Sequence, residues 1–219
     1  MMSDFLSARV MMYDLLARLY TYPLDNAVLD AVLALRVENA PSTLTDALDV
    51  MQARLTATDN RAAFIESLNV EATRLFEGPG QPAAPAYASF YLNEGHLMGE
   101  AALAVRRAYL AANALPRDDG RVPPDHLALE LGFMAFLARA AMSSNEQDAA
   151  SALTNSAAFL REHLSSWVRR FGATVVNATP HPFFVGLANL TRAFLESDDV
   201  WLQENLATER QTLVTEVSS

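Results

Sequence analysis

The sequence of 219 residues contains no cysteine and no lysine. Without cysteine, the chain can form no disulfide framework, no thiolate metal site and no cysteine nucleophile. Without lysine, it has neither the lysine of a Schiff-base enzyme nor that of a Walker-type phosphate loop, and all 16 basic residues are arginine. These two absences remove several classes of enzyme before any motif is considered.

Long apolar runs are also missing. No stretch of about 18 uninterrupted apolar residues occurs, so the sequence predicts no membrane-spanning helix. The N-terminal segment lacks the basic start of a signal peptide and carries Asp4, Arg9 and Asp14 inside its apolar run. The net charge of −10 disfavours nucleic acid and anionic membranes as partners. It is compatible with a basic partner, such as an arginine-bearing peptide.

Helical periodicity runs through nearly the whole chain and predicts an all-α fold, a bundle of about ten helices. Alanine and leucine are abundant, and clusters of β-branched residues are few. We expect an N-terminal helical part at 1–114, a hinge at 115–123 and a C-terminal helical part at 124–219. Near the C-terminus we expect two separate helices, at 181–196 and 199–214.

Residues 77–91 are expected to form the longest irregular stretch inside the chain, because their glycines and prolines cannot propagate a helix. This loop ends in the aromatic residues Tyr87, Phe90 and Tyr91. Rigid prolines and amphipathic aromatics suit a groove that receives a peptide. The alternative is that the aromatic side chains fill the core beneath the loop.

The connector 115–123 is polar, carries Gly120 and joins the two helical parts. These are properties of a hinge. Exchange of helices between two copies across such a hinge is a low-cost route to a dimer. We therefore expect either a monomer or a domain-swapped dimer.

The stretch PPDHLALELGFM, residues 123–134, places Asp125 and His126 at the start of an apolar helix. The carboxylate of Asp125 can accept backbone N–H groups there, or it can belong to a binding site. His126 and Glu130 are four residues apart and share a helix face, as either a satisfied core pair or a site. A metal-dependent hydrolase that uses all three residues is one alternative. The other histidines are isolated, however, so a closed ligand set is improbable and no metal is expected.

Three stretches resemble one known family. The sequence RLFEGPGQPAAPAYASFY, residues 74–91, resembles the loop signature of the TorD/DmsD/NarJ redox-enzyme maturation chaperones. Residues 123–134 resemble the Glu-Pro-x-Asp-His motif of that family and the helix that follows it, and residues 159–195 resemble its C-terminal region. The resemblance covers most of the chain, and the loop and the motif occur in the expected order.

The resemblance implies an all-helical cytoplasmic chaperone with no reaction of its own. Such a chaperone binds the apo form of a catalytic subunit from the DMSO reductase family of molybdoenzymes, often through a twin-arginine leader peptide, until the cofactor is inserted. Asp125 would accept a client arginine, while His126 would orient that carboxylate or stack on the peptide. Carried over residue by residue, the client-binding set is Leu75, Phe76, Tyr87, Ser89 and Tyr91 from the loop, with Asp125 and His126 from the hinge motif.

The chain departs from the family pattern at several positions. Val122 stands where the motif has glutamate, and Tyr87 and Tyr91 stand where many members have tryptophan. These changes concern the identity of the client more than the role. Some members were proposed to bind guanine nucleotides, so a nucleotide is implied by the resemblance alone, and no motif in this sequence supports it. A helical interaction domain without a maturation role is the remaining alternative.

Overall fold

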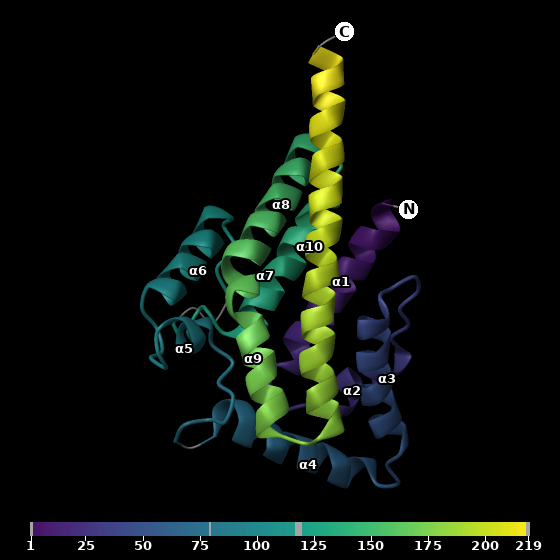
Figure 1. The fold of residues 1–219 in the computed structure, drawn as a ribbon, viewed down its shortest axis with the longest axis vertical. Helices are drawn as coiled ribbons and strands as arrows, with labels where there is room; N and C mark the ends of the chain where they lie inside the picture. Colours follow the sequence, from purple (N-terminus) through teal and green to yellow (C-terminus); the bar gives the residue numbers. More distant parts are fainter. Residues whose placement is uncertain (1, 79, 117–119, 218–219) are drawn as a thin grey trace.

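The computed structural model describes residues 2–78, 80–116 and 120–217, apart from the side chains of Met2 and of residues 208–217. In this part of the chain every regular element is a helix, and strand-like pairing is confined to isolated β-bridge residues, such as the pair Tyr87 and His126. The predicted all-α fold is therefore confirmed (Figure 1). No helix among the described residues is both long enough and apolar enough to cross a membrane.

The helices follow one another along the chain, with two short π-helical turns, η1 and η2, between them. They are α1 (Met2–Leu19), α2 (Asn26–Ala34), α3 (Ser42–Thr56), α4 (Arg61–Ala72), η1 (Thr73–Glu77), α5 (Ala88–Leu92), α6 (Glu100–Ala111), α7 (Leu127–Ala140), α8 (Glu146–Phe159), η2 (Leu160–Leu164), α9 (Ser165–Ala178) and α10 (Pro182–Val217).

The prediction of two helices at 181–196 and 199–214 is wrong, because α10 continues from Pro182 to Val217 without a break. The acidic residues at 196–199 interrupt the apolar pattern, but they include no glycine or proline that would end a helix. Asp198 is buried inside the helix, where a partner from α1 satisfies its carboxylate.

The loop predicted at 77–91 is shorter than expected. Residues 88–92 form the helix α5, and η1 reaches Glu77, so the irregular part covers 78–87. No described residue between Ala111 and Leu127 is helical. Among the described residues, the connector (112–116 and 120–126) therefore has more non-helical residues than the loop (78 and 80–87).

The two helical parts share one hydrophobic core. In the C-terminal part, α7 packs against α1 and α10 packs against α3, while α9 lies alongside α10. Figure 1 shows α10 running through the centre of the molecule, with α4 across its lower end and α5 and α6 at one side. A hinge at 115–123 stays a prediction.

The contact between α3 and α10 depends on the absence of a side chain at Gly186. A Cβ atom at this position would lie 2.6 Å from Cγ of Met51 and 3.0 Å from the carbonyl oxygen of Ala47. Both distances are shorter than ordinary van der Waals contact, and the second involves backbone that cannot move aside. Gly186 therefore sets how closely the two helices approach.

We expect Gly186→Ala to lower the free energy of unfolding by about 1–3 kcal/mol, because overpacking outweighs the better helix propensity of alanine. Gly132→Ala in α7 is the matched control, since a Cβ atom there meets nothing within 4 Å. The control should stabilise the protein by about 0.5–1 kcal/mol. Urea denaturation measures both, and a Gly186→Ala midpoint at or above that of the unmodified protein would contradict this packing.

Candidate functional site

The predicted loop and hinge motif lie side by side in the structure. Tyr87 and His126 form an isolated antiparallel bridge, and the Ala88 N–H donates to the carbonyl oxygen of Asp125 at 3.0 Å. The rings of Tyr87 and His126 meet edge to face, with 4.9 Å between their centres. The connector is thus attached to the loop through both backbone and side chains.

Asp125 and His126 start two different helices. The Asp125 side chain is fully buried, and its Oδ2 accepts the backbone N–H of Ser89, in the first turn of α5, at 2.7 Å. His126 is the N-cap of α7, where its Nδ1 accepts the Ala128 N–H at 3.2 Å. The interpretation of Asp125 as the cap of its own helix is therefore wrong, since Asp125 lies one residue before the capping position. Its carboxylate performs the expected chemistry on a neighbouring helix.

Five of the seven predicted client-binding residues are internal. Leu75 and Phe76 belong to the core, where Phe76 stacks on Tyr22 with 5.6 Å between ring centres. Ser89 is buried, and its hydroxyl accepts the Met98 N–H at 3.0 Å. Asp125 and His126 are also buried, at 0% and 7% exposure, which leaves Tyr87 and Tyr91 partly exposed. Their role in client binding stays a prediction.

Burial determines the charge state of the polar groups in α7. It lowers the pKa of His126 to about 4, although the neighbouring Asp125 acts in the opposite direction. It raises the pKa of the Glu130 carboxyl well above its usual range, and the charge of Asp125 adds to this effect. The uncharged form of each side chain is therefore favoured.

The same geometry bears on the hydrolase alternative. Nδ1 of His126 already accepts a backbone N–H, and Glu130 is fully buried. Across the described ranges, no group of three or more histidine, aspartate or glutamate side chains is arranged to hold a metal ion. Asp125, His126 and Glu130 act here as capping and core residues.

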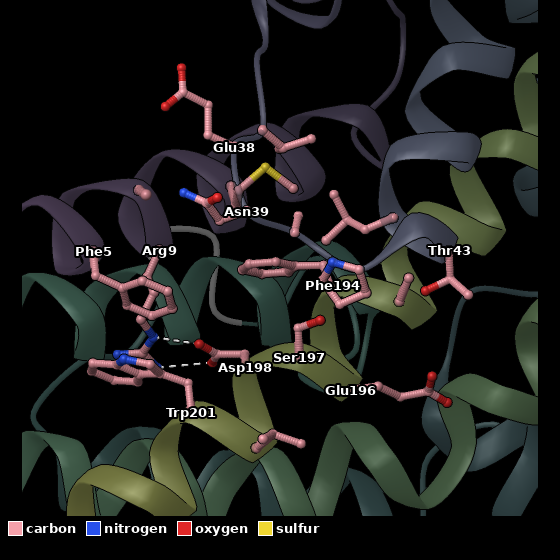
Figure 2. A pocket seen from close by; sticks show the side chains of 18 of the residues that line it. Phe5, Arg9, Glu38, Asn39, Thr43, Phe194, Glu196, Ser197, Asp198 and Trp201 are labelled. Carbon is pink, nitrogen blue, oxygen red and sulfur yellow. Dashed lines mark hydrogen bonds and ion pairs between the residues drawn. The ribbon is translucent and has the colours of Figure 1, made fainter.

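A second candidate site was not found from the sequence. A groove of about 600 Å³ opens between α1, the α2–α3 connector and α10 (Figure 2). Its floor is an ion pair in which Arg9 Nε lies 2.6 Å from Asp198 Oδ1 and Arg9 Nη2 lies 3.0 Å from Asp198 Oδ2. The hydroxyl of Tyr13 also donates to Asp198, at 2.6 Å. All three side chains are buried.

Aromatic side chains line the groove beside this ion pair. Phe5 and Trp201 stack with 4.4 Å between ring centres, and the Arg9 guanidinium lies 5.1 Å from the Trp201 ring (Figure 2). Phe194 adds a third ring to the lining. A single arginine in an apolar helical run was the available signal, because a buried arginine requires an acidic partner. The partner could not be identified, since Asp198 lies 189 residues away.

The sequence is similar to those of known proteins. Residues 33–173 match the sequence model of the nitrate reductase delta subunit family. The chain is 27% identical over 209 residues to the chaperone protein TorD of Shewanella piezotolerans. This match covers 89% of this chain and 92% of that protein. It is 30% identical over 131 residues to the chaperone protein TorD of Vibrio cholerae, covering 59% of this chain and 60% of that one.

One solved structure has the same fold. A redox enzyme maturation protein from Archaeoglobus fulgidus superposes with a TM-score of 0.52 at 23% sequence identity. The match covers 85% of this chain and 93% of that protein. At this identity the likeness establishes the helical architecture alone.

The capping role of Asp125 predicts different effects for two substitutions. Asp125→Ala leaves the buried Ser89 N–H without an acceptor, so we expect a loss of about 1–3 kcal/mol in the free energy of unfolding. Asp125→Asn retains an acceptor oxygen and should lose less than half as much. Urea denaturation measures stability, and hydrogen exchange across 84–99 shows whether α5 frays. Equal losses for the two variants would show that the cap is unimportant.

The lowered pKa of His126 predicts that the stability of the protein depends on pH. In the unfolded chain its pKa is about 6.5, so between pH 6.5 and about 4 the unfolded state binds a proton that the folded state does not. Stability therefore falls as the pH falls through this window. His126→Asn keeps a capping acceptor without titrating. As the pH falls from 7 to 4, the free energy of unfolding of the variant should rise by up to about 3 kcal/mol relative to that of the unmodified protein. Denaturation at a series of pH values measures this, and a difference between the two proteins that stays constant with pH would contradict the prediction.

Proposed function

We propose, from the finding that this chain belongs to the nitrate reductase delta subunit family, that its client is the catalytic subunit of a molybdoenzyme of the DMSO reductase family. The chain is a redox-enzyme maturation chaperone and not an enzyme. The observation that carries this conclusion is the family match over 33–173, together with a curated chaperone relative that covers 89% of the chain.

The chaperone binds the apo form of its client, through an arginine-containing leader peptide, in the cytoplasm and before export or assembly. The net charge of −10 supports a basic peptide as the ligand, because complementary charge accelerates and orients association. The role requires neither a metal nor a nucleotide in this proposal. Whether the chaperone acts as a monomer or as a domain-swapped dimer stays a prediction.

Affinity purification tests the proposal directly. A tagged chain, expressed in its source organism under conditions that induce molybdoenzymes, should retain a molybdoenzyme catalytic subunit identified by mass spectrometry. Because a maturation chaperone releases its finished client, molybdenum analysis should find the retained subunit without cofactor. Retention of the loaded enzyme to the same extent, or recovery of no redox-enzyme subunit, would contradict the proposal.

Deletion of the leader from that subunit tests the finer statement. We expect retention to fall by about tenfold or more, since the leader supplies the arginine contacts, whose loss costs about 1.5–3 kcal/mol. The control is a subunit that keeps its leader and carries a substitution of similar size in its mature part. Unchanged retention would show that the chaperone holds the client through its mature part.

A further inference from the structure

The groove between α1 and α10 is flanked by large apolar side chains that are exposed to solvent. Phe5, Met11 and Val200 line it and are 39%, 49% and 58% exposed. Phe5 stacks on Trp201 (Figure 2), and the exposed apolar side chains come from two helices, α1 and α10. An apolar surface of this kind marks a site of interaction more often than an isolated exposed residue does.

The groove continues beyond the part drawn in Figure 2. A second hollow of about 760 Å³ lies between α1 and α2, and it shares Met11, Leu35 and Arg36 with the first. The two hollows therefore adjoin at these three residues. Two adjoining hollows suit a peptide segment better than a compact small molecule, which a single enclosed pocket suits.

The charges in the lining favour a basic peptide. Four carboxylates line the first hollow, those of Glu38, Glu196, Asp198 and Glu204, against the two guanidinium groups of Arg9 and Arg36. Asp198 is paired with Arg9, and Glu196 is paired with Arg169 and Arg192. With these pairs set aside, Glu38 and Glu204 against Arg36 give the lining a formal charge of one minus two, or −1. Nη1 of Arg9 is buried and has no hydrogen-bond partner among the described residues. This buried N–H is not open to the groove, and the charge of the lining favours a cation.

We propose that this groove binds an apolar, arginine-bearing segment of the client polypeptide. Its apolar side chains pack on Phe5, Trp201 and Phe194, and its basic residue lies near the carboxylate of Glu38. This inference rests on the proposed function, because the client is taken to be a redox-enzyme subunit. It places client binding at α1 and α10 in addition to the predicted loop and hinge motif.

The test introduces a charge at an exposed position in the groove. Val200→Arg should weaken retention of the apo subunit by about tenfold, because it removes an apolar contact and repels the basic segment. Val200→Asp should weaken it less, since it lacks the repulsion. Val176→Arg is the matched control, because Val176 on α9 is 41% exposed and does not line the groove. Circular dichroism verifies that the exposed substitutions leave the fold intact.

The outcomes separate this inference from the proposed function. Equal retention by Val200→Arg and Val176→Arg would overturn the groove and leave the chaperone role standing. A stronger effect of Val200→Asp than of Val200→Arg would overturn the basic character of the segment. If the unmodified chain retains no redox-enzyme subunit, the proposed function fails and a photocrosslinker at position 200, with position 176 as control, decides the groove.

The crosslinked peptide is then identified by mass spectrometry. A crosslink to an apolar, arginine-bearing segment of another protein, formed from position 200 and not from position 176, would support the groove. A crosslink to the chain itself would show that a second copy occupies the groove, which overturns the proposal. The absence of a specific crosslink would also overturn it.

Discussion

The buried ion pair between Arg9 and Asp198 joins the first helix of the chain to the last. Burial by itself lowers the pKa of Arg9, but the Asp198 carboxylate and Tyr13 together more than offset this effect and keep the guanidinium charged. Removing either partner would leave an uncompensated buried charge, at a cost of about 3–5 kcal/mol. Since α1 packs mainly on α7 and α10 mainly on α3, this pair, together with the Phe5–Trp201 stack, sets the distance between α1 and α10. The groove above it depends on that distance.

A second constraint couples the loop to the connector. Asp125 caps α5, and His126 pairs with Tyr87 while it caps α7. Two adjacent residues therefore hold together elements that are far apart in the sequence. A substitution at either residue changes the loop, α5 and the start of α7 at once. A loss of client binding in such a variant therefore indicates a direct contact only where the stability of α5 is unchanged.

The fold class could be predicted from the sequence because helical periodicity is a local property, repeated in nearly every segment. The roles of Asp125 and Asp198 could not, because their partners, Ser89 and Arg9, lie 36 and 189 residues away. The continuation of α10 was missed for the same reason, since Asp198 reads as a polar interruption until Arg9 is placed beside it. The resemblance identified the residues that form the loop and the hinge motif, but their burial depends on tertiary packing.

The two candidate surfaces differ in what a client must displace. Asp125 is fully buried; its Oδ2 accepts the Ser89 N–H, and its Oδ1 has no hydrogen-bond partner among the described residues. A client arginine can bond to Oδ1 without displacing the Ser89 N–H, but it must first open the packing that buries Asp125. At the groove, Phe5, Met11 and Val200 are already exposed, and covering them breaks no hydrogen bond within the protein. Burial of apolar surface there contributes to affinity in full, less the entropy of ordering the peptide. An apolar segment can therefore bind at the proposed groove without displacing buried side chains of the chaperone.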